Sequence, residues 1–452
     1  MTMTRLSIPI LCFLSILSPS GCGRKRAPGL TNIVLVTIDT LRPDHCSAYG
    51  YHRPTTPFLE RLAAEGVLFT RAYSTSSWTV PAMASLFTSL HPRSHGVVRG
   101  FVEDAESRIV NQSILEESHL TLPEVLREAG YRTFAVSTNA HCTPETGFGQ
   151  GFDHFRSLWF QAADKANSEI RELREEISVS EPFFLWIHYF DPHAPYRARS
   201  PWIEDFAARE DLAREWESLS SGQIELRREE VVSDPAVIES LVDLYDSEIA
   251  YCDRAMEKIF SELSLLENTL VVVTSDHGES FLERNLLHHG TSLYEEQIKI
   301  PLVIRLPEGA RRHRVETPVN IIDLFPTIVD LAGLDLPSGL QGRSLRREIE
   351  GEPSAGEVTI TDLEKKKILR SVSEGGWKLI SERNSEKPPE LYNLEEDPGE
   401  TRDLAVENIV ERKRLEALER EWEDATPASF APRRRRGLNR DQTEKLRALG
   451  YL

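Results

Sequence analysis

The sequence predicts an α/β fold built on a mostly parallel sheet, and three apolar runs carry this prediction. They are Asn32–Thr37, Pro182–Phe190 and Asn268–Val273, and each is dominated by aliphatic or aromatic residues. A run of this kind indicates a strand that is buried on both faces, as in sheets covered by helices. The segments between the runs are long enough to supply those helices.

The other predicted elements alternate between helix and strand along the chain. Gly130 ends one helix directly before a strand, because glycine easily adopts the conformation in which helices stop. A long amphipathic helix leads into the third apolar run. Besides the three runs, we expect helices at Pro57–Gly66, Leu122–Ala129, Ile238–Leu266 and Asp323–Leu331, and strands at Tyr131–Ser137 and Ile300–Arg305.

One segment, Glu204–Val232, is highly charged and helix-prone, with Trp216 within it and Trp202 just ahead of it. It is predicted to be an inserted surface segment over the sheet rather than part of the core. Its charges could line the rim that selects a substrate, although runs of charge more often solvate a face.

A second, smaller unit is predicted after residues 342–357, where the sequence becomes polar and contains proline and glycine. The short β-like runs that follow are closely spaced, which favours antiparallel pairing. The expected organisation is a large domain at 30–345 and a C-terminal subdomain at 355–452. The β-like runs are Val358–Thr361, Ile368–Ser371 and Trp377–Ile380, and a terminal helix is expected at Asn439–Leu449.

The N-terminal residues 1–22 are predicted to be a secretory signal. Arg5 precedes the apolar stretch Leu6–Leu17, which is shorter than the roughly 20 residues that span a bilayer. Ser20-Gly21-Cys22 resembles a bacterial lipobox, in which the cysteine becomes lipidated. The alternatives are an ordinary cleaved signal and a lipid anchor at Cys22, and we expect an exported protein of the bacterial envelope, held to a membrane by that anchor.

The composition excludes some partners. A net charge of -19 and a pI of about 5.3 argue against non-specific nucleic-acid binding. The basic run Arg433–Arg436 fits a solvated loop or a contact with lipid head groups. Cys46, Cys142 and Cys252 leave room for one disulfide outside the cytoplasm but form no zinc-binding pattern.

Two of the buried strands end in residues that can bind a metal. Asp276 and His277 follow the run at 268–273, and Asp39 follows the run at 32–37. In open α/β sheets the ligand crevice lies beyond the carboxyl ends of the strands. A polar turn is the alternative for either strand alone, but the pair of strands predicts a site for one divalent metal.

A third motif places a hydroxyl beside an anion site. Pro81 suits the first turn of a helix that runs to about Leu90, and Thr79 is expected just ahead of that helix. Free amide groups and the helix dipole favour an anion there. The Thr79 hydroxyl could cap the helix, or it could act as a nucleophile toward a bound oxyanion.

Together these motifs resemble the sulfatase family of the alkaline phosphatase superfamily, over residues 32–405. The resemblance implies an alkaline-phosphatase-like three-layer sandwich with a mixed central sheet and a four-stranded C-terminal subdomain. Besides Asp39 and the Thr79 helix, the motifs are Trp186-Ile187-His188-Tyr189-Phe190-Asp191-Pro192-His193-Ala194-Pro195-Tyr196, Asp276-His277-Gly278-Glu279, His289-Gly290-Thr291-Ser292-Leu293-Tyr294-Glu295-Glu296, Glu390-Leu391-Tyr392-Asn393-Leu394 and Asp397-Pro398.

The same resemblance implies roles for individual residues. Asp39, Asp276 and His277 would be metal ligands, and Thr79 would be both the nucleophile and the fourth protein ligand. His193 and His289 would contact the transferred group or protonate the leaving oxygen, and His188 could play a similar part. Arg99 could bind the anion. For each histidine the alternative is a structural hydrogen bond.

The chain departs from the family at the nucleophile. Sulfatases carry Cys or Ser there, which is oxidised to formylglycine, and Arg four residues later, whereas this chain has Thr79 and Met83. Oxidation of a threonine hydroxyl gives a ketone, so formylglycine cannot form. A phosphothreonine can instead be hydrolysed by a second attack at phosphorus, which resembles phosphoryl transferases of the superfamily.

The ligand positions also differ from the family pattern. Thr40 stands where a second Asp is usual, His277 where Asn is common, and His289 where many sulfatases have Lys. Imidazole among the ligands favours manganese or zinc over calcium or magnesium.

Three functions follow from these observations. The leading hypothesis is an exported metal-dependent hydrolase that cleaves the sulfate or phosphate ester of a small molecule or glycan through Thr79. The second is an envelope phosphoryl-group transferase, and the third is a non-catalytic binding protein on the same scaffold.

Overall fold

The computed structural model describes residues 31–103, 109–111, 113–180, 182–309, 312–352, 358–429, 436–438, 442–444 and 446. The predicted signal and lipobox at 1–22, most of the basic run at 433–436 and most of the terminal helix at 439–449 therefore lie outside the described residues. Within these ranges, none of the helices combines the length and apolar character needed to cross a bilayer.

A nine-stranded mixed sheet forms the centre of the large domain. Strand β1 (Asn32–Ile38) lies between β8 (Thr269–Ser275) and β7 (Phe183–Tyr189), and all three run parallel. The mixed sheet of the family is thus confirmed. On the β7 side the sheet continues with β5 (Arg132–Ser137) and then β6 (His154–Ser157), both parallel. On the β8 side it continues with antiparallel β11 (Lys299–Arg305) and then β2 (Val67–Tyr73). The short strands β12 (His313–Val315) and β13 (Val319–Asn320) both pair with β2.

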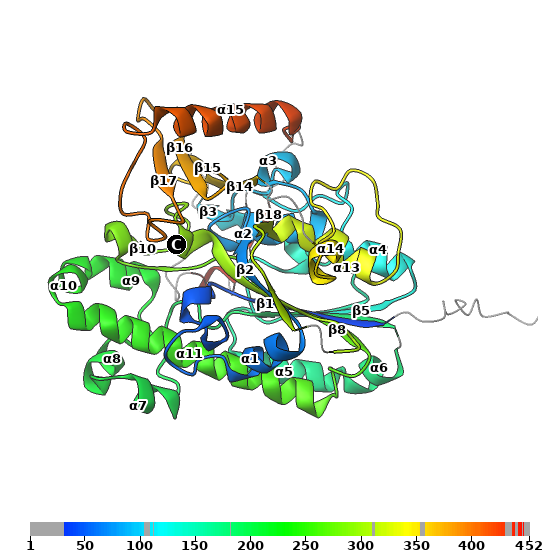
Figure 1. Cartoon of the computed structure of the whole chain (residues 1–452). Coiled ribbons are helices and arrows are strands. Elements are labelled where there is room, and N and C mark those ends of the chain that lie inside the picture. Colours follow the sequence, from blue (N-terminus) through cyan, green and yellow to red (C-terminus); the bar gives the residue numbers. More distant parts are fainter. Residues whose placement is uncertain are drawn as a thin grey trace, which may run out of the picture.

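Helices cover both faces of this sheet, which explains the uninterrupted apolar runs (Figure 1). Along β1, Val34 and Val36 enter the core on one face while Ile33 and Leu35 enter the core on the other. The first face carries α1 (Pro57–Glu65), α5 (Ala163–Glu172) and α11 (Pro235–Glu262), and the second carries α2 (Thr79–Thr88), α4 (Leu122–Glu128) and α13 (Leu324–Leu331).

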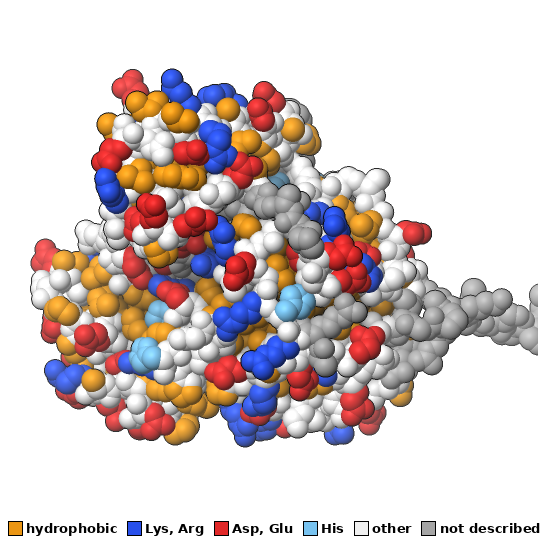
Figure 2. All heavy atoms as spheres, in the orientation of Figure 1, with side chains coloured by type: hydrophobic (Ala, Val, Ile, Leu, Met, Phe, Trp, Pro, Cys, Tyr) orange, Lys and Arg blue, Asp and Glu red, His pale blue; other side chains and the backbone are white. Residues whose placement is uncertain are grey.

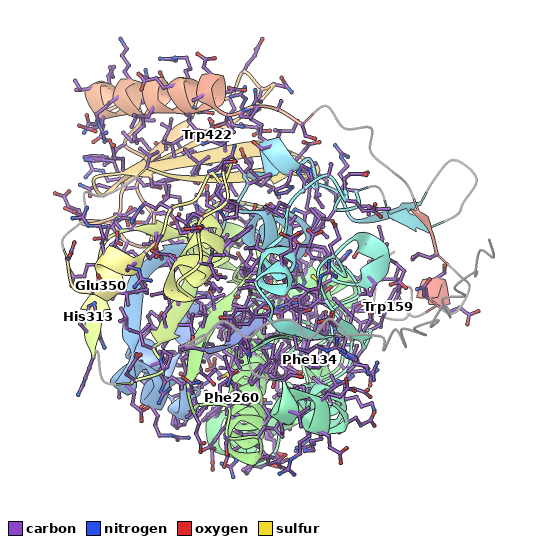
Figure 3. All side chains as sticks on the ribbon, turned by 90° about the vertical axis from the view of Figure 1, so that its right-hand side faces the viewer. Phe134, Trp159, Phe260, His313, Glu350 and Trp422 are labelled. Carbon is purple, nitrogen blue, oxygen red and sulfur yellow. The ribbon has the colours of Figure 1, made fainter. Side chains whose placement is uncertain are left out.

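The charged segment after β7 is largely exposed, as predicted for a surface segment, but it also contributes a few apolar side chains to the core, which the sequence did not predict. It folds into α7 (Trp202–Phe206), α8 (Glu210–Trp216), α9 (Ser221–Leu226) and α10 (Arg228–Ser233). Each helix buries one or two apolar residues in the core that contains α11, and Trp216 is only 1% exposed. Figure 3 shows Phe134 and Phe260 of this same core. Because charged residues dominate the segment, its apolar pattern is sparse, and the buried apolar residues are Ile203, Ala213, Trp216, Ile224 and Val231.

The C-terminal subdomain is an antiparallel four-stranded sheet, as expected. Its strands are β14 (Thr359–Glu364), β15 (Ile368–Glu374), β16 (Trp377–Glu382) and β17 (Glu390–Asn393). Helix α15 (Ile409–Ala425) packs on one face, where Trp422 lies between the helix and the sheet (Figure 3). The Arg370 guanidinium stacks 4.5 Å from the Trp422 ring centroid.

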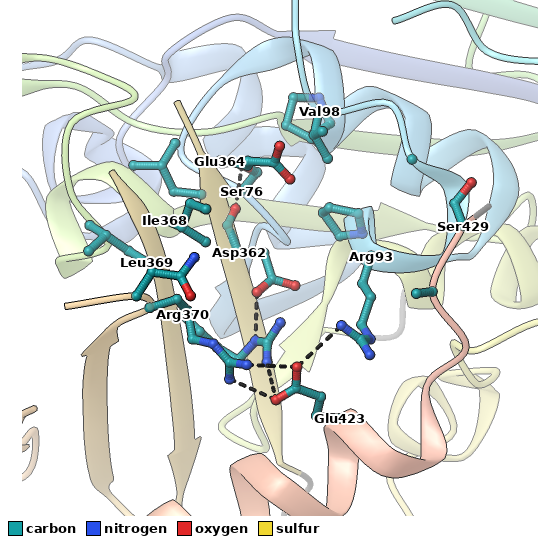
Figure 4. Close-up of a pocket in the computed structure, with 17 residues that line it drawn as sticks. Ser76, Arg93, Val98, Asp362, Glu364, Ile368, Leu369, Arg370, Glu423 and Ser429 are labelled. Atoms are coloured by element: carbon teal, nitrogen blue, oxygen red, sulfur yellow. Dashed lines mark hydrogen bonds and ion pairs between the residues drawn. The ribbon is translucent and has the colours of Figure 1, made fainter. Parts of the chain in front are cut away.

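Two sets of contacts join this subdomain to the large domain. Strand β14 follows residues 74–76, where the Asp362 amide donates to the Thr75 carbonyl at 2.8 Å and the Ser76 hydroxyl donates to the Asp362 carbonyl at 2.7 Å. Buried Lys378 of β16 pairs with Glu400 at 2.7 Å and with Glu295 at 3.1 Å. Figure 4 shows the junction beside β14, a cavity of about 330 Å³ in which Arg93 and Arg370 both approach Glu423.

The remaining elements are short. Basic and acidic side chains are interspersed over the face drawn in Figure 2 rather than gathered in one basic stripe. Cys46, Cys142 and Cys252 are free and buried. The short elements are α3 (Pro92–His95), β3 (Phe101–Glu103), β4 (Ile109–Asn111), α6 (Arg174–Val179), β9 (Ser280–Phe281), β10 (Leu287–His288), α12 (Glu295–Ile298), α14 (Arg346–Ile349) and β18 (Arg436–Gly437).

Candidate active site at the carboxyl edge of the sheet

The strand register brings the predicted metal ligands together. Ile38 of β1 pairs with Ser275 of β8, so the next residue on each strand, Asp39 and Asp276, leaves the sheet at the same level. His277 follows directly. One ligand atom from each of these three residues lies within 4.8 Å of the other two, and all three residues are fully buried. The described residues thus contain a group that could hold a metal ion.

The hydrogen bonds of His277 leave one ring nitrogen free for this role. His277 Nδ1–H donates to the Gly278 carbonyl at 2.9 Å, so Nε2 carries the lone pair. That Nε2 lies 3.5 Å from Asp39 Oδ1 and 3.4 Å from Asp276 Oδ2. A neutral imidazole and two carboxylates are donors suited to one divalent cation.

The carboxylates themselves show that a cation fits. Asp39 Oδ1 and Asp276 Oδ2 are buried and have no hydrogen-bond partner among the described residues. Burial, followed by the charge of Asp276, raises the pKa of Asp39 well above its usual value. Two buried carboxylates with unpaired oxygens are costly in a protein interior, and a bound cation would offset that cost.

Neighbouring groups fix both carboxylates. The Asn139 side-chain amide donates to Asp39 Oδ2 at 2.5 Å, and the Thr40 and His277 backbone amides donate to Asp276 Oδ1 at 3.3 and 3.0 Å. Thr40 has a φ of 56°, a strained conformation for a β-branched residue. This conformation directs the Thr40 amide toward Asp276 Oδ1. The oxygens without a hydrogen-bond partner, Asp39 Oδ1 and Asp276 Oδ2, then face the shared centre.

Thr79 is the first residue of helix α2, not the residue just ahead of it as predicted. Trp78 occupies the cap position, and no side chain caps this helix. The capping alternative for the Thr79 hydroxyl is therefore not what the structure shows. Thr79 Oγ1 instead lies 3.2 Å from His277 Nε2, at the same centre as the two carboxylates.

His188 lies behind this centre. The Trp186 indole N–H donates to Thr37 Oγ1 at 3.0 Å, and Thr37 Oγ1 lies 2.6 Å from His188 Nδ1. The Thr37 hydroxyl also donates to the Ile187 carbonyl at 3.5 Å, and the other ring nitrogen, His188 Nε2, lies 3.6 Å from Asp39 Oδ2. His188 is fully buried, and this placement favours support of Asp39 over contact with a substrate.

His193 and His289 stand side by side in front of the centre. Their ring centroids are 4.9 Å apart, and the His289 ring lies 4.4 Å from that of His277. His193 Nδ1–H donates to the Ala194 carbonyl, and His289 Nδ1–H donates to Glu279 Oε1 at 3.1 Å. Burial lowers the pKa of both histidines well below the usual value, so each presents a neutral Nε2.

A cavity of about 380 Å³ opens in front of these groups. Thr79, His193 and His289 line it, so the structure places the predicted nucleophile and both predicted histidines on one wall. Arg99 also lines the cavity, where its guanidinium pairs with Glu364 at 3.2 Å. The volume falls within the range of small-molecule sites, roughly 300–1,000 Å³.

Several residues of the site were not predicted. Asn139 and Glu279 could have been found, since each follows a strand that the sequence indicates and lies beside a predicted ligand. His141 and Lys365 also belong to the cavity. Lys365 comes from the turn after β14, in the other subdomain, and no local pattern connects it with this site.

Comparison with known proteins identifies the family. The family model described as Sulfatase matches residues 31–334, and the one described as N-sulphoglucosamine sulphohydrolase, C-terminal, matches residues 287–425. Because the first match spans more than half of the chain, the chain belongs to the sulfatase family and is an ester hydrolase of the alkaline phosphatase superfamily.

Relatives of this chain include two named sulfatases. "Uncharacterized sulfatase YidJ" of Escherichia coli (strain K12) is 26% identical, with 82% of this chain and 82% of that protein covered. Arylsulfatase K of Homo sapiens is 24% identical, with 90% and 85% covered.

Solved structures confirm the fold. A protein in complex with its substrate D-glucosamine-2-N,6-O-disulfate superposes with a TM-score of 0.72 at 20% identity, covering 88% of this chain and 98% of that one. A phosphonate monoester hydrolase from Silicibacter pomeroyi gives 0.69 at 20% identity, covering 91% and 99%. The alkaline-phosphatase-like architecture is therefore shown.

Proposed function

We propose that this protein is a metal-dependent hydrolase that uses Thr79 as a covalent nucleophile toward sulfate or phosphate esters. The position of the Thr79 hydroxyl carries the proposal. It lies 3.2 Å from His277 Nε2, where two unpaired carboxylate oxygens converge, and it caps no helix. Asp39, Asp276 and His277 would hold the metal, and Thr79 would complete the set.

The chemistry of threonine favours phosphate over sulfate. A formylglycine hydrate releases sulfate by elimination from its geminal hydroxyl, and a threonine ester has no such hydroxyl. A phosphothreonine can be hydrolysed when water attacks phosphorus in line. Relatives are named both as sulfatases and as a phosphonate monoester hydrolase, so both ester types belong in the test.

The bound metal would stabilise negative charge on the transferred group and lower the pKa of the Thr79 hydroxyl. Imidazole in the donor set supports manganese or zinc over calcium or magnesium. The amide groups at the start of α2 would face the non-bridging oxygens of the substrate.

His289 is best placed to carry the proton. As Thr79 Oγ bonds to phosphorus or sulfur, His289 Nε2 accepts the hydroxyl proton, and the ester oxygen that departs on the opposite side of the transferred group takes its proton from solvent. Glu279 accepts from His289 Nδ1–H at 3.1 Å and would stabilise the imidazolium. Water then cleaves the Thr79 ester, restores the hydroxyl and releases the oxyanion. His193 shares this wall, but only a carbonyl supports its ring.

Export and anchoring at Cys22 remain part of the proposal. The lipobox-like Ser20-Gly21-Cys22 after a short apolar stretch supports them, and the substrate would then be a small molecule or glycan ester met at the envelope. Labelling of cells with a lipid precursor would test this, and loss of the label in Cys22→Ala is the expected result.

The activity is tested with matched nitrophenyl sulfate, phosphate monoester and phosphodiester, on protein loaded with manganese or zinc. Thr79→Ala should abolish turnover, while Thr88→Ala, on the same helix and bonded only to the Ala84 carbonyl, should retain it. Phosphoester turnover that is lost in Thr79→Ala but kept in Thr88→Ala supports the proposal, as does a trapped phosphothreonine at position 79.

Two results would overturn parts of the proposal. Full turnover by Thr79→Ala would exclude Thr79 as the nucleophile. Failure of the wild-type protein to turn over any of the three esters, with metal bound, would exclude hydrolysis of simple esters and shift weight to a transferase or a binding protein. Sulfate turnover that depends on Thr79 would show that threonine can serve a sulfatase.

A further inference from the structure

The catalytic cavity has room for more than the ester group. Thr79, His193 and His289 occupy its inner wall, while Trp78, Arg99, Phe101, Lys365 and Lys366 line the rest. With about 380 Å³ of space, the cavity accommodates the leaving group as well as the group transferred to Thr79. The residues of the outer part therefore bear on which leaving group is accepted.

The outer wall is formed by a turn of the C-terminal sheet. Glu364 of β14 pairs with Ile368 of β15, so Lys365, Lys366 and Lys367 form the turn between the two strands. The hydrogen bonds of β14 with residues 74–76 carry this turn toward Trp78 and Thr79. Figure 4 shows Ser76 beside Asp362 and Glu364 at this junction.

Lys365 is built into the cavity. Its Nζ lies 4.5 Å from the centroid of the Trp78 ring, in cation–π geometry. Gly290, next to His289, makes room for it, because a Cβ at position 290 would lie 2.7 Å from Lys365 Nζ. The ammonium thus stands between the residue before Thr79 and the residue after His289.

The charge of this wall is not balanced. Arg99 pairs with Glu364, whereas Lys365 and Lys366 form no ion pair with any residue that the structure describes. The Lys365 side chain is open to the cavity. Its pKa is nevertheless lowered to about 8, first because the surrounding protein partly desolvates the ammonium and second because Lys366 is also positively charged. Lys365 is therefore mostly charged at neutral pH, and none of the residues that the structure describes forms an ion pair with it.

We propose that Lys365, packed on Trp78 and assisted by Lys366, binds a second anionic group on the leaving portion of the substrate. The preferred substrate is then an ester whose alcohol carries its own carboxylate, sulfate or phosphate. This inference rests on the proposed function for the position of the leaving group, and it assigns the C-terminal turn the role of selecting that group.

The test compares two leaving groups on the same acid. One ester has 4-nitrophenol as its alcohol and the other has 3-carboxy-4-nitrophenol, which adds a carboxylate. Lys365→Met should lower kcat/KM for the carboxylated ester by about tenfold or more, the loss expected for a charge-assisted contact. For the plain ester the change should stay within about twofold, because the same contact is absent there.

Two variants serve as matched controls. Lys367→Met removes a charge from the same turn but outside this cavity, and it should leave the ratio of the two kcat/KM values unchanged. Lys365→Arg keeps the charge and should retain most of the preference. Equal losses on both esters in Lys365→Met would overturn the proposal, as would no loss on either.

A binding measurement tests the anion subsite independently of the proposed nucleophile. Calorimetry of 3-carboxy-4-nitrophenol, the free alcohol, requires no turnover. Tighter binding to wild-type protein than to Lys365→Met supports the anion subsite even if Thr79 proves not to be the nucleophile. Equal binding by the two proteins overturns the subsite even if Thr79 is the nucleophile.

Discussion

The two walls of the catalytic cavity differ in how they are built. The inner wall, formed by Thr79, His193 and His289, lies against the ends of β1 and β8, where Asp39, Asp276 and His277 are fully buried. On the outer wall, Lys365 and Lys366 come from the exposed turn between β14 and β15. The comparison teaches that the proposed reaction chemistry lies on the sheet edge, while the proposed substrate preference lies on a turn that can change without disturbing the core.

The largest effect is expected at the three buried residues behind the inner wall. Asp276→Asn should lower turnover by at least about 10³-fold, because a metal at this centre supplies several kcal/mol of charge stabilisation and each 1.36 kcal/mol corresponds to tenfold. Metal analysis should show a matching loss of bound ion. Asp335→Asn, an exposed carboxylate, is the control, and unchanged turnover in Asp276→Asn would mean that these residues do not carry the reaction.

The second largest effect is expected at the contact between the C-terminal subdomain and the large domain, where Lys378 lies. Lys378→Met removes the buried cation shared by Glu295 and Glu400, while Arg284 stays 3.3 Å from Glu400 and Lys299 stays 3.8 Å from Glu295. Loss of one partner of a buried pair costs about 3–5 kcal/mol when no other cation remains, so we expect a loss near the lower end of that range. Denaturant unfolding measures this loss. The exposed pair of Lys387 and Glu390 gives the control, because Lys387→Met should cost less than about 1 kcal/mol.

The pH dependence sharpens this prediction. Burial raises the pKa of Glu400 to about 7, although Lys378 lowers it. A raised carboxyl pKa means that the folded state holds the proton more tightly than the unfolded chain does. The contribution of Glu400 to the free energy of unfolding therefore falls as the pH rises from the pKa of the unfolded chain, 4.5, through the folded pKa of about 7. Without Lys378 the penalty grows, and the loss in Lys378→Met should be larger at pH 8 than at pH 5.

A smaller effect is expected from a residue that only positions a ligand. Asn139→Ala removes the amide that holds Asp39 Oδ2, and loss of such a partner typically costs 10–100-fold in metal affinity or activity. The measurement is the metal dissociation constant together with kcat. If metal affinity and kcat both stayed at wild-type values, the positioning role attributed to Asn139 would be wrong.

The smallest effect concerns the outer wall and pH. With a pKa of about 8, Lys365 is charged below pH 8 and loses its charge above it, so KM for a carboxylated ester should rise between pH 7 and 9. About a tenth of the side chains remain charged at pH 9. His141, His289, Lys366, Arg99 and Glu364 also face this group.

Substitution isolates the contribution of Lys365. Burial lowers the pKa of His141 to about 3 and that of His289 well below its usual value, so these histidines stay neutral across the range. Lys365→Arg should remove the rise in KM because arginine keeps its charge. A rise that persists in Lys365→Arg would assign it to another group.

The sequence predicted the candidate metal ligands for a physical reason. Asp39, Asp276 and His277 each follow a strand that is apolar on both faces, and parallel strands present their carboxyl ends at one edge. The helix that begins at Thr79 was predicted one residue late, because Pro81 marks the first turn without fixing the first residue. The few core residues of the segment 204–232 were missed because one or two buried apolar residues per helix give too weak a pattern.

The sequence by itself determined the α/β class, the order of the elements and the residues able to hold a metal, since burial pattern and strand ends are local properties. Only the tertiary structure decided that the Thr79 hydroxyl faces His277 rather than capping its helix, that Glu279 supports His289, and that Lys365 enters the cavity. Each of these depends on the approach of segments far apart in the chain, and for Lys365 on the docking of β14 along residues 74–76. Local sequence carries no record of that approach.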